Sequence, residues 1–529
     1  MKTVRLGDNL DGIKAAAEIL KADGVVAMPT ETVYGLAASA YSDTAIFKVF
    51  SAKGRPQDNP LIVHISDLDM LSGVVSEFSE KAKALAEKFW PGPLTMVLPK
   101  GEKVCDSVSR GLATVAVRMP ENKVARELIK ISDLPLAAPS ANLSGSPSPT
   151  TADHVIADLD GKIDAVIMSG ECAVGVESTV VSLVTNPPRL LRPGFITAEQ
   201  LRETLPDLVI DKAVLEELKS GEKAASPGMM YKHYSPKTEV FLVEGSNNQF
   251  ISFVNTKENS AAVCFSEEAA RIKAKTLSLG NKEDTADHAK RLFSLLRECD
   301  GLGVETIYIH APTKEGVGLA VYNRLVRAAG FKIIKLKNII GLTGPTGSGK
   351  TTACTVAEKL DYKIINCDVL ARKAVEQEDA LSALTKVFGT DILENGKLNR
   401  KNLAEKAFKS KEKTELLNKT LLPFIVKLIK EEIEKADEDK ILLDAPTLYE
   451  SGADSLCDSV IAVLSGIDNR KNRILVRDNL TEDAANLRIG AGKNDEYYKE
   501  KTQHIIYNNG SLKDFKNEFK AKLKTLEEM

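Results

Sequence analysis

Two kinds of apolar pattern alternate along the first part of the chain. Residues 13–21 and 81–88 place apolar side chains three and four positions apart, which is typical of helices that bury one face. Short runs rich in β-branched residues lie between and after them, at 25–28, 61–65, 114–117 and 179–184. The alternation predicts a mixed α/β domain, to which we assign residues 1–205.

The pattern changes twice further along the chain. Residues 206–237 become polar and then irregular, which indicates a linker. A small second α/β domain is predicted over 238–336, and a third domain over 338–529. The second domain rests on strand-like runs at 240–243, 261–265 and 306–309 and on helical patterns at 285–298 and 319–329.

The third domain begins with the most specific motif of the chain. Residues 344–351 fit the pattern G-x-x-x-x-G-K-[ST] and follow a strand-like run at 339–342. Such a loop turns backbone N–H groups toward the phosphates of ATP, while its lysine reaches the outer phosphates and its last hydroxyl holds Mg²⁺. The predicted ATP-binding residues here are Gly344, Gly347, Ser348, Gly349, Lys350, Thr351 and Thr352.

Composition limits what the chain binds and where it works. Lys and Arg total 71 against 74 for Asp and Glu, so the net charge of −3 provides no general basic field, and we expect no stable nucleic-acid binding. The seven cysteines include no C-x-x-C pair, which argues against a disulfide framework or a zinc site. No run of eighteen apolar residues occurs. These features predict a reduced cytoplasmic protein without a membrane span.

Three polar clusters follow strand-like runs in the first domain. They are residues 29–35 with 53–64, residues 139–145, and residues 176–180 with 191–194. Lys53 and Arg55 flank a glycine and precede a proline, so a stiff turn would present both charges to a polyphosphate or carboxylate. Each cluster alone is also compatible with ordinary turns. His64 could likewise be a structural histidine in the core.

Together these clusters resemble the threonylcarbamoyl-AMP synthase family. The K-x-R signature lies at Lys53 and Arg55, and the S-x-N signature at Ser140 and Asn142. Residues 226–236 resemble the linker of the longer family members, which continue into a Rossmann-like domain. The resemblance implies that L-threonine, bicarbonate or CO₂, and ATP become threonylcarbamoyl-AMP and pyrophosphate. The product would pass to partner proteins that modify tRNA.

The resemblance also implies roles for individual residues. Lys53 and Arg55 would be catalytic, and the linker tyrosines Tyr231 and Tyr234 would cover the site. The implied threonine-binding residues are Thr30, Thr32, Tyr34, His64, Arg118 and Thr179. The implied ATP-binding residues of this site are Lys53, Arg55, Ser140, Asn142, Ser182 and Arg192.

Two carboxylates accompany the phosphate loop of the third domain. A strand-like run at 363–368 ends in Asp368, and another at 441–444 ends in Asp444. In a small-molecule kinase Asp368 can accept the proton of the attacking hydroxyl, and both acids with Thr351 can hold Mg²⁺. Arg372, one turn further on, would bind the phosphates of the acceptor. A helix-capping role remains open for either aspartate.

The order of these motifs resembles dephospho-CoA kinase over about residues 338–529. Arg473 and Arg477 share one helical face, as a lid over the triphosphate requires, and Arg488 follows. The resemblance implies phosphorylation of the ribose 3′-hydroxyl of dephospho-CoA. This chain departs from the family pattern at Pro345, Leu422 and Gly492. A different hypothesis makes the front half an RNA-binding module, fused to a P-loop kinase for a nucleoside or nucleotide.

Overall fold

The structure, a computed structural model, describes residues 2–54, 59–216, 234–394 and 396–528. It divides into two compact units. The front unit contains residues 1–244 and 251–334, and the rear unit contains residues 245–250 and 335–529. Two predicted site residues, Arg55 and Tyr231, lie outside the described residues.

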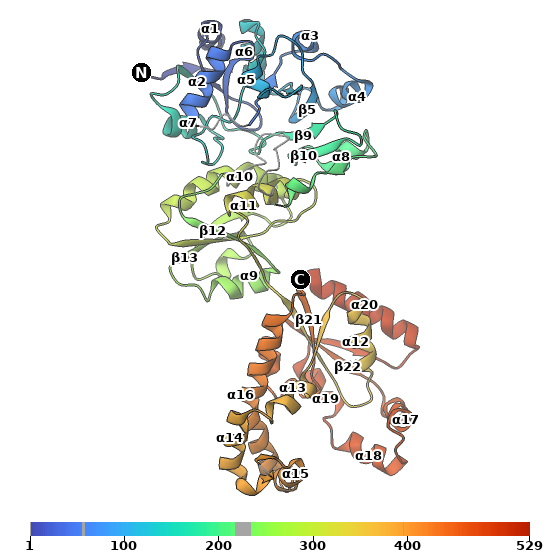
Figure 1. Cartoon of the computed structure of the whole chain (residues 1–529). Helices are drawn as coiled ribbons and strands as arrows, with labels where there is room; N and C mark the ends of the chain where they lie inside the picture. Colours follow the sequence, from blue (N-terminus) through green and yellow to red (C-terminus); the bar gives the residue numbers. More distant parts are fainter. Residues whose placement is uncertain (1, 55–58, 217–233, 395, 529) are drawn as a thin grey trace. The chain divides into compact units, whose positions relative to one another are not determined.

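A large mixed sheet forms the centre of the first domain (Figure 1). Parallel pairs such as β1 with β8 alternate with antiparallel pairs such as β5 with β6. In spatial order the described strands are β1 (Val4–Gly7), β8 (Ala165–Met168), β2 (Val26–Met28), β3 (Gly35–Ser39), β7 (Leu136–Ala137), β4 (Ile62–His64), β6 (Thr114–Arg118), β5 (Leu94–Pro99), β9 (Thr179–Ser182), β10 (Arg189–Arg192) and β11 (Val209–Ile210).

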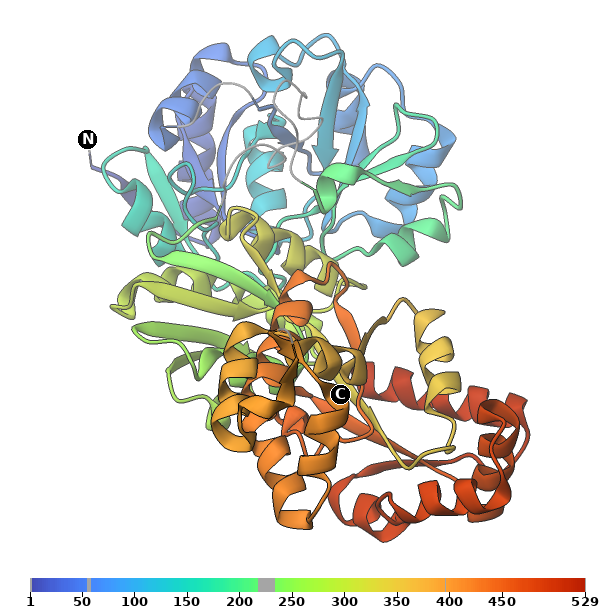
Figure 2. The same cartoon turned by 60° about the horizontal axis from the view of Figure 1, so that its bottom comes forward.

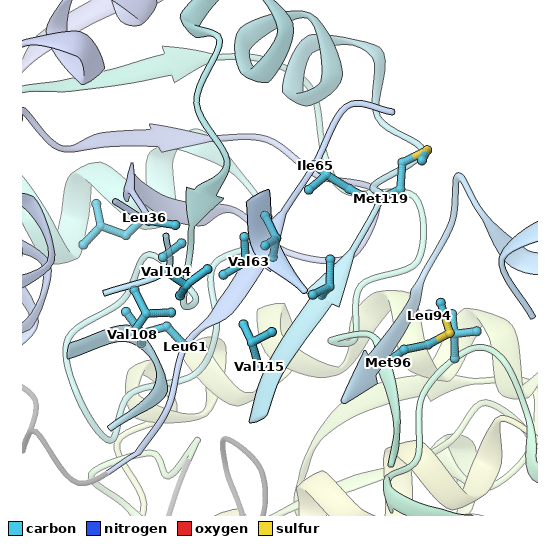
Figure 3. Packing of buried hydrophobic residues seen from close by; sticks show 14 of the residues in the cluster. Leu36, Leu61, Val63, Ile65, Leu94, Met96, Val104, Val108, Val115 and Met119 are labelled. Atoms are coloured by element: carbon cyan, nitrogen blue, oxygen red, sulfur yellow. The ribbon is translucent and has the colours of Figure 1, made fainter. Parts of the chain in front are cut away.

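Helices cover this sheet with one apolar face each. In α1 (Leu10–Lys21), for example, the side chains spaced three and four apart are buried, and Asn9 caps the first turn by accepting a hydrogen bond from Gly12 N at 3.0 Å. The other main helices are α2 (Asp43–Lys53), α4 (Glu80–Phe89), α6 (Lys123–Ser132) and α7 (Ala152–Leu159). Figure 3 shows Leu36, Leu61 and Val63 meeting Val104 and Val108 in the main core cluster.

A second, smaller sheet completes the front unit. Its order is β14 (Lys275–Gly280), β13 (Ser260–Phe265), β15 (Thr306–His310), β12 (Glu239–Glu244) and β16 (Ile333–Lys335), and the first four strands run parallel. Figure 1 shows α10 (Thr285–Glu298) and α11 (Gly318–Ala328) together on one face of this sheet. Their apolar side chains share a core cluster with Val33, Val174 and Val176 of the first domain. The small domain is therefore packed onto the first domain.

The rear unit has a five-stranded, fully parallel sheet in the order β18 (Lys363–Asn366), β21 (Lys440–Asp444), β17 (Asn338–Thr343), β22 (Ser459–Leu464) and β23 (His504–Tyr507). The helices α12 (Lys350–Glu358) and α20 (Leu512–Glu528) pack together beside it. Figure 2 shows a helical group, drawn in orange, made of α13 (Cys367–Ala374), α14 (Glu378–Phe388), α15 (Arg400–Ala407) and α16 (Lys411–Lys435). Of these, α13 and α16 pack against β18 and β21.

The structure confirms the predicted α/β class and corrects one predicted strand. The strand expected over 363–368 ends at Asn366, because the Asn366 side chain accepts a hydrogen bond from Val369 N at 3.0 Å and starts α13. Asp368 therefore lies in the first helical turn instead of at the end of a strand. No helix within the described ranges has the length and apolar character that crossing a bilayer requires.

Candidate active sites

The front unit contains a cavity lined by most of the residues that the sequence pointed to. They are Thr30, Thr32, Lys53, His64, Arg118, Ser140, Asn142 and Arg192. Three other predicted residues do not line it. The Tyr34 hydroxyl donates to Ser169 O at 2.8 Å, the Thr179 hydroxyl donates to Ile196 O at 2.6 Å, and Ser182 is buried at the end of β9.

Lys53 is fixed by the loop that carries the S-x-N signature. It is the last residue of α2, which ends because Gly54 adopts a left-handed conformation with φ +57°. The Lys53 ammonium, 3% exposed, donates to the carbonyl oxygens of Ser140 and Asn142 and to Asn142 Oδ1 at 3.2 Å. The Ser140 hydroxyl donates to the same Oδ1 at 2.6 Å. The two sequence signatures therefore form one hydrogen-bonded unit.

Arg118, at the end of β6, is the second buried cation of the cavity. Its guanidinium donates to the Thr32 hydroxyl at 2.9 Å and to the carboxylate of Glu31, and both charged side chains are nearly inaccessible. Burial would raise the pKa of Glu31, but the charge and hydrogen bond of Arg118 outweigh it and hold that pKa below its ordinary value. Arg118 and Glu31 are thus a charged pair.

The turn at residues 30–33, which contacts Arg118 through Thr32, is held by hydrogen bonds of the Thr30 hydroxyl. Thr30 Oγ1 accepts hydrogen bonds from the backbone N–H groups of Thr32 and Val33, both at 3.2 Å, and donates to Val33 O. His64 lies across the cavity with Nδ1 at 3.2 Å from Ile62 O. Burial and then the charge of Arg118 lower the pKa of His64 to about 3. The imidazole is therefore neutral near pH 7.

Arg192, at the end of β10, is the third cation that lines the cavity. Its Nε donates to Ser178 O at 3.0 Å and its Nη2 donates to the Ser178 hydroxyl at 3.1 Å. Thr95 Oγ1 lies 2.7 Å from the same hydroxyl. Arg192 is 7% exposed, and burial lowers its pKa to about 10, so it keeps its charge at pH 7. Three cations thus surround one cavity before any substrate arrives.

Sequence reasoning missed two acids of this site and a distant arginine. Glu31 and Glu177 lie inside quoted clusters but carry no motif of their own. Arg324 lies on α11, is fully buried, and donates from Nε to Glu177 Oε2 at 3.0 Å. A single sequence contains no signal that pairs positions 177 and 324. Tyr234, in the predicted linker, also lines the cavity, with its ring 5.2 Å from that of Phe293.

The rear unit has a second cavity around the phosphate loop. It is lined by Thr346, Gly347, Gly349, Lys350, Thr351, Thr352, Asn366, Asp368, Asp444, Pro446, Asn472, Arg473, Val476, Arg477 and Arg488. The predicted loop, acids and lid arginines therefore come together. Arg372 lies apart from them, exposed on α13 beside an apolar groove with Leu398 and Leu403.

The phosphate loop requires its glycines. Gly344 has φ +139°, and a Cβ there would lie 2.2 Å from Val463 O. Gly349 has φ +115°, and a Cβ there would lie 2.2 Å from the side-chain nitrogen of Asn508. That nitrogen donates to Ser348 O at 2.8 Å, so Asn508 supports the loop from behind.

The charges inside this cavity face one another. Lys350 folds back on the loop and donates to Gly344 O at 2.7 Å, while Asp444 Oδ2 accepts from the Asn366 amide at 3.1 Å. Asp444 Oδ1 is buried and has no hydrogen-bond partner among the described residues. Burial raises the pKa of Asp444 above its ordinary value although the charge of Lys350 opposes this. A cation-binding role would satisfy this oxygen.

The lid arginines come from α17 (Ile467–Asp478) and α18 (Glu482–Gly490). Arg473 donates to the loop carbonyl of Ser348 at 3.1 Å and to Asn508 O at 2.9 Å. Arg477 forms a two-bond fork to Asp478, at 2.7 and 2.8 Å, and Arg488 donates to the same carboxylate at 2.8 Å. One carboxylate thus joins two arginines that line the cavity.

Three family models match consecutive parts of the chain. The family described as telomere recombination matches residues 18–194, and the C-terminal domain of threonylcarbamoyl-AMP synthase matches residues 196–330. The dephospho-CoA kinase family matches residues 338–514. The matches follow one another along the chain with little overlap or gap, which indicates two enzymes joined end to end.

Individual relatives agree with these matches. The threonylcarbamoyl-AMP synthase of Pyrococcus abyssi is 44% identical over 61% of this chain and 96% of its own length, and that of Bacillus subtilis is 43% identical over 63% and 97%. The dephospho-CoA kinase of Fusobacterium nucleatum is 35% identical over 33% of this chain and 92% of its own length. The crystal structure of P. abyssi Sua5 complexed with L-threonine is 42% identical, with a TM-score of 0.59, over 63% of this chain and 99% of that chain.

The fold and the two cavities define a double enzyme of the ATP-using transferase class. The chain belongs to the threonylcarbamoyl-AMP synthase family in its front unit and to the dephospho-CoA kinase family in its rear unit.

Proposed function

We propose that the front cavity forms threonylcarbamoyl-AMP and pyrophosphate from L-threonine, bicarbonate or CO₂, and ATP. We also propose that the rear cavity phosphorylates the 3′-hydroxyl of dephospho-CoA with ATP. The observation that supports this best is the pair of separate cation-lined cavities, each built from one family's motifs. The corresponding parts are a synthase domain over 1–205, a linker over 206–237, a small Rossmann-like domain over 238–336 and a kinase domain over 338–529.

In the front cavity the chemistry is an attack on the α-phosphorus of ATP. An oxygen of the N-carboxylated threonine forms a bond to this phosphorus, and the bond to the pyrophosphate oxygen breaks. Both reactants are anions, so positive groups that are already in position lower the barrier by neutralising charge. Lys53, Arg192 and, outside the described residues, Arg55 have this role. No protein nucleophile is needed.

The remaining residues of the front site would bind and orient. Ser140 and Asn142, which line the cavity, are proposed to orient ATP through neutral hydrogen bonds. Thr30, Thr32, His64 and Arg118 would hold the threonine. Tyr34, Thr179 and Ser182 do not line the cavity and would support the residues that do. Neutral His64 beside charged Arg118 suits a substrate that carries both an ammonium and a carboxylate, since only one fixed cation then meets the carboxylate. Tyr234 would help to cover the cavity and exclude water.

In the rear cavity the γ-phosphoryl group moves to a ribose hydroxyl. Lys350 would leave its loop carbonyls and contact the outer phosphates, and Arg473 and Arg477 would neutralise the charge that develops there. The backbone of Gly344, Gly347, Ser348 and Gly349 and the Thr352 side chain would hold the β-phosphate side. Asp368 would accept the proton of the 3′-hydroxyl. Arg372, which lies outside the cavity, would contact the acceptor's phosphates only where the acceptor extends beyond it.

The rear cavity also fits Mg²⁺. Thr351, Asp368 and Asp444 offer one hydroxyl and two carboxylates, and Mg²⁺ takes few protein ligands beside phosphate and water. The unpartnered Asp444 Oδ1 is the observation that favours a cation. Among the described residues no cluster of three His, Cys, Asp or Glu side chains forms a metal site without substrate. Bound Mg²⁺ would neutralise phosphate charge during transfer.

Product identification tests both activities in one protein. The purified chain is incubated with ATP, Mg²⁺ and either threonine with bicarbonate or dephospho-CoA, and products are identified by mass. We expect threonylcarbamoyl-AMP with pyrophosphate in the first case and CoA with ADP in the second. Pyrophosphate release should need threonine but no RNA. A front unit that instead binds RNA, with affinity falling by orders of magnitude as salt rises, would contradict the proposal.

A further inference from the structure

Arg324 connects the small domain of the front unit to the wall of the synthase cavity. It is fully buried on α11, and its Nε donates to the Glu177 carboxylate at 3.0 Å. Its Nη1 donates to Pro193 O at 2.6 Å and its Nη2 donates to Glu177 O at 3.4 Å. One side chain of the small domain therefore holds two separate loops of the first domain.

Both loops carry residues of the cavity. Glu177 lines it and precedes Ser178, and Pro193 follows Arg192. The two bonds from Arg192 to Ser178 then close the connection between the loops. The backbone oxygens of Glu177 and Pro193 that Arg324 binds each lie one residue from a side chain of the cavity wall, Ser178 and Arg192. A shift of Arg324 would therefore move that wall.

A second arginine of the small domain makes the same kind of contact elsewhere. Arg297 on α10 forms a two-bond fork to Asp158 of α7, at 3.1 and 2.8 Å, and donates to Pro147 O. Pro147 follows Ser146, whose carbonyl accepts from the Asn142 amide at 2.7 Å. Asn142 in turn holds Lys53. Arg297 thus supports the loop with the S-x-N signature.

Attachment of the small domain alone does not account for these two arginines. The shared core cluster already packs Leu292, Phe293 and Leu296 of α10 with Val174 and Val176 of the first domain. Apolar contacts of this kind provide adhesion, whereas a buried ion pair adds little net stability and mainly fixes geometry. Burial would raise the pKa of Glu177, but the charges of Arg324 and Arg192 outweigh it and hold that pKa below its ordinary value. Glu177 is therefore a charged anchor for Arg324.

We propose that Arg297 and Arg324 are positioning residues of the synthase reaction. Through Arg297 the small domain sets the loop of Asn142, which holds Lys53, and through Arg324 it sets the two segments that carry Ser178 and Arg192. The proposal rests on the proposed function of the front cavity, because it assumes that these loops face the phosphates of ATP. The threonine side, built by Thr32 and Arg118, has its own anchor in Glu31. The small domain should therefore act on ATP and on turnover, and not on threonine binding.

The test uses two separate variants of the full chain, Arg324→Lys and Arg297→Lys. Lysine keeps the positive charge but has a single nitrogen, so it cannot make the several simultaneous hydrogen bonds of each arginine. We expect kcat for threonine-dependent pyrophosphate release to fall by about 10- to 100-fold and KM for ATP to rise severalfold, with KM for threonine within about twofold of the parent. Arg291→Lys is the matched control, since Arg291 lies on α10 but pairs with Asp287 of the same helix at 2.7 Å. Its kinetics should equal those of the parent.

Two measurements on the same samples separate positioning from misfolding. The dephospho-CoA kinase activity of each variant reports the concentration of active chain, and the fluorescence of Trp90, the single tryptophan, reports unfolding of the front unit alone. Glu177→Gln, which keeps the shape but removes the charge, should reproduce the loss of activity of Arg324→Lys.

Three outcomes would overturn the proposal. Parent-like kcat and KM for ATP in both lysine variants would exclude positioning. A loss that affects threonine and ATP equally and follows a lower Trp90 unfolding midpoint would show a purely structural role. A loss of similar size in Arg291→Lys would do the same. Failure of the proposed function is distinct from these, because the parent chain itself would then release no pyrophosphate with threonine.

Discussion

The two nucleotide cavities of this chain hold their positive charges in different ways. In the front unit Lys53 and Arg118 are each 3% exposed and are hydrogen-bonded to the fold. In the rear unit the side chains of Arg477 and Arg488 are 53% and 50% exposed and are paired with one carboxylate of the lid. The front cavity has its charges in place before substrate binds, whereas two cations of the rear cavity are exposed and are held by a single carboxylate.

The largest effect should be on stability and should come from removing one partner of the buried Arg118–Glu31 ion pair. Arg118→Met leaves the Glu31 carboxylate buried without its cation, so we expect the free energy of unfolding of the front unit to fall by about 3–5 kcal/mol. Urea unfolding followed by Trp90 fluorescence measures this. The double variant Glu31→Gln/Arg118→Met should recover part of the loss. Arg477→Met, at an exposed lid position, should leave the unfolding of the rear unit nearly unchanged by circular dichroism.

The second effect is on activity: loss of the lysine of one cavity should impair that cavity's reaction and spare the other. Lys53→Ala should lower threonine-dependent pyrophosphate release by about 10²–10³-fold and leave CoA formation intact, since each lysine serves one transition state. Lys350→Ala should do the reverse. Lys48→Ala, at an exposed position of the same helix as Lys53, is the control and should change neither. Equal loss of both activities in one lysine variant would mean a shared site.

The third effect concerns salt. Exposed charges are screened by ions far more than buried ones, so raising NaCl from about 50 to about 200 mM should raise the KM for ATP of the kinase severalfold. The KM for ATP of the synthase should rise less. Initial rates of ADP and pyrophosphate release from one protein sample give both values. A larger rise of the KM for ATP in the synthase than in the kinase would contradict this difference between the two cavities.

The smallest effect tests the carboxylate that joins the lid arginines. Asp478→Asn keeps the shape but loses the charge that holds Arg477 and Arg488, so both guanidinium groups should spend less time in the cavity. We expect the KM of the kinase for ATP to rise about two- to threefold, with a smaller change in kcat, because exposed ion pairs contribute little. An unchanged KM would show that the arginines need no such support.

The sequence predicted those parts of the molecule whose chemistry is local. The phosphate loop is set by glycines whose conformations and close contacts exclude other residues, so its pattern is visible in eight positions. The amphipathic helices and most buried strands were confirmed for the same reason. Asp368 was placed wrongly at a strand end, because the cap formed by Asn366 resembles the end of a strand in sequence.

The parts that could not be predicted are contacts between distant positions. Arg118 meets Glu31 across 87 positions, and Arg324 meets Glu177 across 147. Neither partner belongs to a short pattern, and charged residues are common on surfaces, so nothing in one sequence distinguishes a buried pair from two solvated side chains. The assignments of individual residues to threonine, ATP, acceptor and Mg²⁺ stay predictions.

The contact between Arg324 and Glu177 also affects the order in which the enzyme matures. A chain emerges from the ribosome N-terminus first, and its domains generally fold as units. The synthase wall therefore stays incomplete until position 324 has left the ribosome. The front cavity is completed only after the small domain has been made.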